Sequence, residues 1–332
     1  MVNKVLICFG TRPEWLKVKP IAEKLENSQL LFTGQHKDLL EGIKVDYTIE
    51  IGNETNRLDQ IISDCLLQFP EGDFNTVAVH GDTVSALACA LAAFSRKKRI
   101  IHIEAGLRSY DLKQPYPEEG YRQMISRIAD IHLAPTELSA ENLIKEKVAG
   151  KIYVVGNSVL DNLLPYKDKT SYGDKVLVTL HRWENHGWMD KWFREVNELA
   201  KNYSNLEFII PLHHHPEVRK HKHLLTHINI VPALPHDELL EIMTQSKLII
   251  TDSGGLQEEG SFFNKKVIVC RDVTERPEGI ETGHLHLCHY PEQLQELFGN
   301  LIENYYIDTK CPYGDGDTAN LIKSILDDYS NS

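Results

Sequence analysis

Short apolar runs rich in β-branched residues recur along the chain, with helical patterns between them. Runs that are apolar at nearly every position are typical of parallel strands covered on both faces. Helical segments between such strands indicate βαβ units, so the sequence predicts an α/β fold. In the first half the predicted strands are Val5–Phe9, Thr76–His80, Ile100–Ile103, Ile131–Ala134 and Ile152–Val155. In the second half they are Val176–Leu180, Glu207–Pro211, Ile228–Val231, Leu248–Thr251 and Val267–Cys270.

The series pauses once, at residues 164–175, where Pro, Gly, Lys, Asp and Ser gather without apolar periodicity. A chain of 332 residues is long enough for about two domains, and we place the linker in this stretch. The prediction is two Rossmann-like domains, residues 1–168 and 169–318, with parallel sheets facing a central cleft. Open parallel sheets bind ligands beyond the carboxyl ends of their strands. The residues that follow each strand are therefore the first candidates for a site.

The overall charge narrows the class of partner. The formal net charge is -12, which argues against a nucleic-acid-binding surface but still permits a local positive pocket for a small anion. No apolar run approaches the roughly 20 residues that a membrane-spanning helix needs. The first residues run directly into a predicted strand and lack the features of a signal peptide. We expect a soluble cytoplasmic protein with no nucleic acid or membrane partner.

The first predicted strand is followed by GTRPE, residues 10–14. Gly10 permits a tight turn, Pro13 suits the start of a helix, and Arg12 is placed to reach a phosphate near that helix N-terminus. The alternative is a plain strand-to-helix turn with a surface arginine. The GxGxxG fingerprint is absent, so a nicotinamide dinucleotide is disfavoured.

Two carboxylates follow later strands of the first half. Asp82 comes after the second strand and Glu104 after the third, both on the expected ligand side of the sheet. Each has a structural alternative, since Asp82 suits a helix cap and Glu104 could pair with Arg108 four residues later.

A third carboxylate position lies in PYPEEGYR, where Glu118 and Arg122 share one face of a predicted helix. Glu118 and Glu119 also suit the N-terminus of that helix, where negative charge is stabilised by the dipole. Three carboxylate positions nevertheless point toward one crevice. Like charges brought together raise one another's pKa, and this suits proton transfer.

In the second half, His181 and Arg182 end the first strand and can contact a phosphate oxygen. Three adjacent histidines, His213, His214 and His215, end the next strand. Neighbouring positions rarely converge on one ion, and no HExxH-like spacing exists, so a metal site is disfavoured.

The segment TDSGGLQEE, residues 251–259, follows another strand and opens a helix. Its two glycines let backbone N–H groups approach a ligand, and the helix N-terminus favours an anion. Glu258 and Glu259 are explained either as first-turn acids that the dipole stabilises, or as acceptors for two neighbouring ribose hydroxyls. Two further cationic candidates follow the next strand, Arg271 and Arg276.

The motifs GTRPE, GDT, EAGLRS, PEE, HRWEN, DSGGLQEE, TERPE and PYGDG occur in the order and approximate spacing of one family. The sequence resembles bacterial non-hydrolysing UDP-N-acetylglucosamine 2-epimerases from Gly10 to about Ala319. The resemblance implies a GT-B type fold, a homodimer and a final helix, residues 319–332, that packs back on the first domain. It also implies inversion at C2 of UDP-GlcNAc to give UDP-ManNAc, by anti elimination of UDP and its re-addition to a 2-acetamidoglucal. No cofactor and no metal would be needed.

The resemblance also implies roles for individual residues. The acid–base carboxylates of the family match Asp82, Glu104 and the pair Glu118–Glu119, and the family histidine near the diphosphate matches His181. Its cationic partners match Arg12, Lys17 and Arg276, and its UDP-binding loop matches Ser253, Gly254 and Glu259. Further candidates for binding the substrate are Arg122, His213, Gly255 and Arg271.

Several positions depart from the family pattern. Tyr121 and His215 stand where asparagines are usual, and these changes bear on the identity of the sugar. Gln35 and His36 resemble the start of a segment that lines an allosteric UDP-GlcNAc site, but Lys37 replaces its arginine and loses the fork geometry. We therefore expect allosteric activation to be weakened or lost.

Four readings of the function remain open at the level of sequence. The substrate is UDP-GlcNAc or a related UDP-HexNAc, such as a diacetamido uronic acid. A hydrolysing relative would release ManNAc and UDP, although that branch usually lacks the Pro13-Glu14 found here. A glycosyltransferase on the same fold would not need the carboxylates, and a catalytically dead nucleotide-binding protein would not need the charged motifs.

Overall fold

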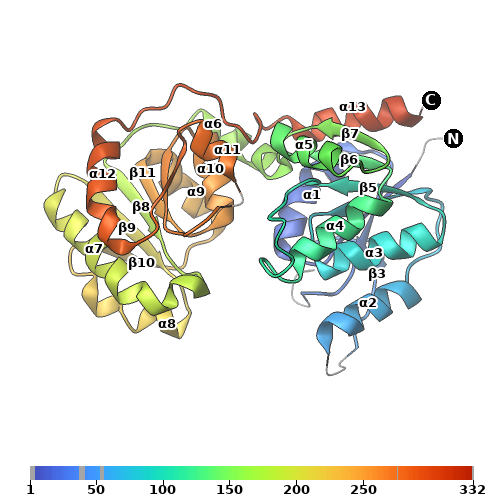
Figure 1. Ribbon diagram of the computed structural model, residues 1–332, viewed down its shortest axis with the longest axis horizontal. Helices are drawn as coiled ribbons and strands as arrows, with labels where there is room; N and C mark the ends of the chain where they lie inside the picture. Colours follow the sequence, from blue (N-terminus) through green and yellow to red (C-terminus); the bar gives the residue numbers. More distant parts are fainter. Residues whose placement is uncertain (1–3, 37–41, 53–55, 275, 331–332) are drawn as a thin grey trace. The chain divides into compact units, whose positions relative to one another are not determined.

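The computed structural model describes residues 4–36, 42–52, 56–274 and 276–330, and it divides the chain into two compact units (Figure 1). The first unit contains Met1–Asn162 and Gly314–Ser332, and the second contains Leu163–Tyr313. The first change of unit thus falls just before the stretch in which we placed the linker. Backbone hydrogen bonds explain this position, because Ser171 N donates to Thr244 O at 2.9 Å and thereby joins that stretch to the second unit.

The first unit contains a seven-stranded sheet in the order β3-β2-β1-β4-β5-β6-β7, with every neighbouring pair parallel. The chain winds outward from β1 on one side and from β4 on the other. This reversal marks the switch point where open α/β sheets bind ligands. The strands are β1 Val5–Phe9, β2 Ser28–Phe32, β3 Tyr47–Thr48, β4 Thr76–His80, β5 Arg99–Ile103, β6 Ile131–Ala134 and β7 Lys151–Val154.

The second unit repeats this winding in a six-stranded parallel sheet, ordered β10-β9-β8-β11-β12-β13. Its switch point lies between β8 and β11. Two Rossmann-type parallel sheets confirm the predicted fold class. The strands are β8 Lys175–Thr179, β9 Glu207–Leu212, β10 Asn229–Pro232, β11 Ser246–Thr251, β12 Lys266–Val269 and β13 Leu285–Leu287.

Helices connect the strands in both units, as Figure 1 shows. No helix among the described residues is both long and apolar enough to cross a bilayer. Those of the first unit are α1 Arg12–Lys24, α2 Arg57–Leu67, α3 Val84–Ser95, α4 Glu118–Ile128, α5 Glu137–Lys145 and α13 Thr318–Ser330. Those of the second are α6 Leu164–Lys167, α7 Met189–Asn202, α8 Pro216–Arg219, α9 His236–Gln245, α10 Gly254–Phe262, α11 Pro277–Glu281 and α12 Leu294–Glu303.

Strand β1 illustrates why its run is apolar at every position. Leu6 and Cys8 belong to a core cluster on one face of the sheet, and Ile7 and Phe9 belong to the cluster on the other face. A strand buried on both faces favours an apolar side chain at nearly every position. Asp82, Glu104 and Asp252 lie in turns that follow strands, whereas the ionisable His102 and His132 are buried within strands.

Three strands were missing from the prediction: β2, β3 and β13. Strand β2 begins with Ser28 and Gln29, β3 has only two residues, and β13 carries His286 between two leucines. Each lacks the continuous apolar run by which the other strands were recognised. Hydrogen bonding to an existing parallel neighbour is enough to extend these short segments as strands.

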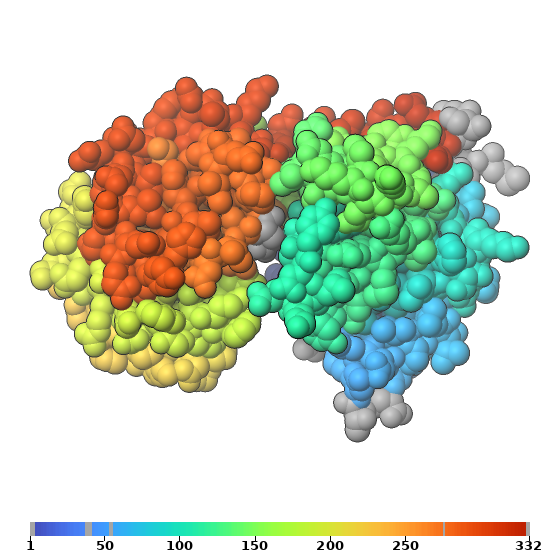
Figure 2. Space-filling view, viewed as in Figure 1, coloured from blue at the N-terminus to red at the C-terminus, as the bar shows by residue number. Residues whose placement is uncertain are grey.

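The C-terminal helix α13 packs in the first unit, where Ala319 and Ile322 join a core cluster with Val18 and Ile21 of α1. Its red atoms are visible along the upper margin of that unit in Figure 2, behind the green atoms. Asp161 caps this helix, since its carboxylate accepts hydrogen bonds from Thr318 N at 3.1 Å and Ala319 N at 2.7 Å. These bonds satisfy backbone donors that a helix N-terminus leaves without partners.

We predict that Asp161→Ala loosens the docking of α13. Loss of a helix cap costs about 1 kcal/mol, which lowers the melting temperature of a domain of this size by about 2–4 °C. Calorimetry or circular dichroism during heating checks this. The matched control is Asp308→Ala, at an exposed position of the second unit, which should leave the melting temperature unchanged. Equal melting temperatures for both variants would contradict the capping role.

Candidate active site

Glu14 fixes the two turns beside the switch point of the first sheet. Its Oε2 accepts hydrogen bonds from Gly10 N at 3.0 Å and Thr11 N at 2.8 Å, in the turn after β1. Its Oε1 accepts from Thr83 Oγ1 at 2.7 Å, in the turn after β4. Arg12, the first residue of α1, is exposed. Glu14 therefore organises the GTRPE turn, a role that the sequence motif did not reveal.

Glu104 lies directly after β5 in the left-handed region, with φ of 61°, which is unusual for a residue with a side chain. Its Oε1 accepts a hydrogen bond from Lys17 Nζ at 2.5 Å, and its Oε2 lies 3.1 Å from His80 Nε2. Burial raises the pKa of Glu104, but Lys17 and His80 outweigh this effect and hold the pKa well below its usual range. Glu104 is therefore an anion at neutral pH.

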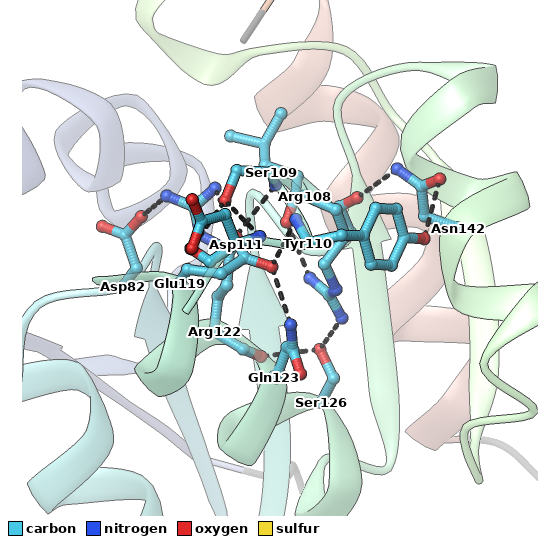
Figure 3. A network of polar contacts seen from close by, with 12 residues as sticks. Asp82, Arg108, Ser109, Tyr110, Asp111, Glu119, Arg122, Gln123, Ser126 and Asn142 are labelled. Carbon is cyan, nitrogen blue, oxygen red and sulfur yellow. Dashed lines mark hydrogen bonds and ion pairs between the residues drawn. The ribbon is translucent and has the colours of Figure 1, made fainter. Parts of the chain in front are cut away.

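Asp82 and Arg122 form an ion pair at the same edge of the sheet (Figure 3). Asp82 does not cap the next helix, because Thr83 does so by accepting a hydrogen bond from Ala86 N at 3.0 Å. Arg122 is buried, and its Nη1 lies 3.5 Å from Glu119 Oε2. One guanidinium thus lies between two of the predicted carboxylates.

The adjacent glutamates of α4 differ in their surroundings. Glu119 is fully buried and accepts hydrogen bonds from Ser109 N at 3.0 Å, Tyr110 N at 3.2 Å and Gln123 Nε2 at 2.8 Å. Figure 3 shows its carboxylate among these donors. Glu118 is half-buried, and no hydrogen bond or ion pair engages it within the described part of the chain. Only Glu118 keeps its carboxylate open to a ligand.

Arg108 pairs with Glu146, the C-cap residue of α5, and not with Glu104. Its Nε and Nη2 donate to the two oxygens of Glu146 at 2.6 and 2.9 Å, and Nη2 also donates to Ser126 Oγ at 2.9 Å. The side chain of Arg108 is completely buried. The expected i,i+4 pair was wrong because Glu104 ends a strand, so the two residues do not share a helix. Arg108 instead anchors the loop that places donors on Glu119.

Asp252 organises the corresponding edge of the second sheet. It follows β11, is fully buried, and accepts hydrogen bonds from His181 N and Arg182 N, both at 2.9 Å, and from Asn185 Nδ2 at 3.0 Å. The turn after β8 is thereby fastened to the turn after β11, across the switch point. Asp252 belongs to the segment TDSGGLQEE, but no role was predicted for it. Its place directly after an apolar strand was the available signal.

The predicted histidines of this edge do not converge as metal ligands do. His213 stacks on His181 with ring centroids 5.0 Å apart, whereas His215 Nδ1 accepts a hydrogen bond from Glu217 N at 3.2 Å and caps α8. Burial, followed by the neighbouring histidines, lowers the pKa of His213. Among the described residues, no group of three His, Cys, Asp or Glu side chains is arranged to hold a metal ion.

Helix α10 begins at Gly254, and Ser253 is its N-cap without a side-chain capping bond. The first N–H groups of a helix lack intrahelical partners and favour an anion. Arg276 lies over this end, since its Nη1 is 3.1 Å from the point where a Cβ on Gly254 would be. Arg276 Nε also donates to Glu258 Oε1 at 2.7 Å. A guanidinium and a helix N-terminus thus meet at Gly254.

Glu258 and Glu259 lie in the second turn of α10, so the interpretation as first-turn acids was wrong. Both are buried. Glu259 Oε1 contacts His236 Nε2 at 3.0 Å, while its buried Oε2 has no hydrogen-bond partner among the described residues. A buried carboxylate oxygen without a donor costs free energy. Glu259 is therefore prepared to accept a hydrogen bond from a ligand.

The other predicted residues lie near these two edges or outside them. Arg271, half-buried, follows β12, and Gly255 is the second residue of α10. Gln35 Oε1 accepts a hydrogen bond from Ser85 Oγ at 2.7 Å, and His36 is exposed. Lys37 lies outside the described residues, so the weakened allosteric site stays a prediction. Tyr121 packs on the core cluster that contains Ile125.

Comparison with known proteins identifies relatives along nearly the whole chain. A family model described as UDP-N-acetylglucosamine 2-epimerase matches residues 21–327. The UDP-N-acetylglucosamine 2-epimerase of Campylobacter jejuni is 37% identical over 98% of this chain and 98% of its own length.

Solved structures agree with the sequence relatives. The UDP-GlcNAc 2-epimerase from Neisseria meningitidis, bound to UDP-GlcNAc, has a TM-score of 0.83 at 34% identity, over 98% of this chain and 100% of that chain. The S. aureus MnaA–UDP structure has a TM-score of 0.85 at 34% identity, over 99% and 97%. On the family model and these full-length relatives together, the chain belongs to the UDP-N-acetylglucosamine 2-epimerase family.

Proposed function

We propose that this protein is a non-hydrolysing 2-epimerase that interconverts UDP-GlcNAc and UDP-ManNAc. The observation that carries the proposal is 34% identity, over 98% of this chain, to an epimerase whose structure holds UDP-GlcNAc. The two sets of polar side chains at the strand ends supply independent support, since one suits a nucleotide diphosphate and the other suits proton transfer. The homodimer that the resemblance implies stays a prediction.

The second unit offers what a UDP group requires. The N-terminus of α10 and the guanidinium of Arg276 both favour an anion near Gly254, which suits a diphosphate. His181 and its neighbours are held in place by Asp252 at the adjacent turn. The open oxygen of Glu259 suits a ribose hydroxyl, which donates a hydrogen bond that this buried acceptor lacks.

The first unit offers carboxylates in different electrostatic states. The C2 proton of the sugar is weakly acidic, so its removal needs a base together with stabilisation of the departing UDP. Asp82 is paired with Arg122, Glu104 is held as an anion by Lys17 and His80, and Glu118 is open. Carboxylates with such different surroundings can divide acid and base roles between them.

Within the adjacent pair, we assign the catalytic role to Glu118. Glu119 is saturated by two backbone N–H groups and one amide, so a proton on it would break bonds that hold the 109–110 backbone. Glu118 accepts no hydrogen bond from the backbone among the described residues. The sequence alone left this choice open, because both glutamates suit the start of a helix.

Proton NMR of UDP-GlcNAc incubated with the protein in D2O, without added metal or NAD, tests the reaction. We expect a UDP-ManNAc anomeric signal with deuterium at C2, because a proton removed at C2 exchanges with solvent before it returns. Accumulation of free ManNAc and UDP would instead indicate a hydrolysing enzyme. No change at C2, while a diacetamido uronic acid analogue does react, would indicate a different UDP-sugar as the substrate.

Glu118→Gln and Glu119→Gln form a matched pair. We expect Glu118→Gln to lower kcat by about 10²- to 10⁴-fold with an unchanged melting temperature, since it removes a proton-transfer group. Glu119→Gln should lower the melting temperature, because an amide accepts the two backbone bonds less strongly than a carboxylate. Steady-state kinetics and thermal unfolding measure both effects. Full activity of Glu118→Gln would show that Glu118 is not the catalytic member of the pair.

Asp252→Asn tests the organisation of the nucleotide side. All three donors converge on Oδ2, and an amide oxygen accepts them less strongly because it carries no full charge, so the turn carrying His181 should be held less firmly. We expect UDP affinity to fall by about tenfold or more, measured by calorimetry. Asp272→Asn, at an exposed position nearby in sequence, is the control and should bind UDP normally. Unchanged UDP affinity in Asp252→Asn would show that UDP binding does not depend on how Asp252 holds this turn.

A further inference from the structure

His80 is a buried histidine that no sequence motif singled out as functional. It is the last residue of β4 and precedes Gly81 and Asp82. Its side chain is 5% exposed, and its Nε2 lies 3.1 Å from Glu104 Oε2. This is an ion-pair contact, and Nε2 has no hydrogen-bond partner among the described residues. Since a carboxylate oxygen only accepts, any proton shared across this contact comes from His80 Nε2.

Lys17 of α1 engages the other oxygen of the same carboxylate, with Nζ 2.5 Å from Oε1. Glu104 is 10% exposed and Lys17 is 16% exposed, so little water competes for these contacts. Each oxygen of Glu104 thus faces a nitrogen, the Lys17 ammonium at Oε1 and the His80 imidazole at Oε2. The charged or titratable groups that contact it come from two elements, α1 and β4.

The backbone at Glu104 supports a functional origin for this arrangement. A residue with a side chain pays about 1–3 kcal/mol for a left-handed conformation, and such residues cluster at active sites. Gly81 also adopts a left-handed conformation, with φ of 63°, which favours glycine, and Glu104 Oε2 is the nearest atom to its missing Cβ, at 3.4 Å. The turns after β4 and β5 are therefore shaped around one carboxylate.

Resting on the proposed epimerase function, we propose that His80 is a positioning residue that acts through Glu104, fixing the orientation of its carboxylate and keeping it ionised. Lys17 alone leaves Oε2 free to rotate away or to take up a proton. With His80 in place, the carboxylate has one orientation and presents its charge at the carboxyl edge of the sheet. His80 itself need not contact the substrate.

The chain contains a matched control on the neighbouring strand. His102 of β5 is also buried, and its Nε2 donates to Gly81 O at 2.8 Å, so it supports the backbone and not Glu104. Burial lowers the pKa of His102 to about 3, so it stays neutral. If His80 only supported the backbone, substitutions of His80 and of His102 would have similar effects on kcat and on its pH dependence.

The test compares His80→Leu, which has no donor, with His80→Gln, whose amide can occupy the place of Nε2. We expect His80→Leu to lower kcat by about 10- to 100-fold, the usual range for a lost charge-assisted hydrogen bond, with KM little changed. His80→Gln should recover part of the loss. An unchanged kcat in His80→Leu, or an equal loss in both variants, would overturn the proposal.

The pH profile separates positioning from structural support. A donor beside a carboxylate lowers its pKa, so losing His80 raises the pKa of Glu104. Activity that needs ionised Glu104 is then lost at a higher pH as the pH falls. The acid limb of kcat should move upward by about one pH unit in His80→Leu and stay in place in His102→Gln. An unmoved limb in His80→Leu contradicts the proposal.

A double-mutant cycle shows whether His80 acts through Glu104. The variant with both His80→Leu and Glu104→Gln should be no less active than Glu104→Gln alone, because the acceptor is already lost. For His102→Gln combined with Glu104→Gln, the fold losses in activity of the two single variants should instead multiply. If the fold losses of His80→Leu and Glu104→Gln also multiplied in their double variant, the proposal would be overturned.

A titration independent of turnover keeps this inference separate from the proposed function. Carbon-13 labelling of glutamate carboxyl groups, with the Glu104 signal assigned by Glu104→Gln, reports its pKa directly. The pKa should rise in His80→Leu even if the wild-type protein fails to epimerise UDP-GlcNAc. If His80→Leu does not fold, His80→Ala, which also lacks a donor, supplies both the titration and the profile. An unchanged Glu104 pKa in a folded variant without a donor at position 80 overturns the proposal.

Discussion

Burial of the strands on both faces decides where ionisable side chains can lie in this protein. Strand β1 contributes alternate residues to two core clusters, and a charge within it would have to leave water without a partner. The turns after the strands are free of this limit. Because the strands of each sheet are parallel, those turns gather at one edge. Asp82 and Glu104 in one unit, and His181 and Asp252 in the other, all occupy such turns.

The carboxylates of this protein differ in their roles because they accept hydrogen bonds from different donors. Glu14, Glu119 and Asp252 accept several hydrogen bonds each, mostly from backbone N–H groups, and so hold loops in place. Glu118 and one oxygen of Glu259 have no donor in the described protein. A carboxylate held by backbone N–H groups loses those bonds when it takes up a proton or a ligand, whereas an open one does not. Backbone donors therefore mark the carboxylates that hold loops, while Asp82 and Glu104 are engaged only by side chains.

The sequence predicted the long strands and most strand-end residues because both depend on local patterns. It did not predict which charges pair, since Arg108 and Glu146 are 38 residues apart and meet only through packing of α5. The same reason explains why Asp252 received no role and why the choice between Glu118 and Glu119 stayed open. Strands β3 and β13 were missed because their short segments owe their conformation to a neighbouring strand. Which side chains pair with one another is decided by tertiary packing and does not follow from a local sequence pattern.

Asp82 and Glu104 differ in the charged side chains that contact their carboxylates. Asp82 faces a guanidinium that also approaches Glu119, so its partner is shared. Glu104 faces an ammonium and an imidazole that occupy separate oxygens, so its charge is fixed. A fixed anion orients cations and substrate groups, while a carboxylate with a shared partner can exchange that partner for a ligand. Two acids that follow adjacent strands thus differ in electrostatic environment because α1 supplies Lys17 to Glu104 and α4 supplies Arg122 to Asp82.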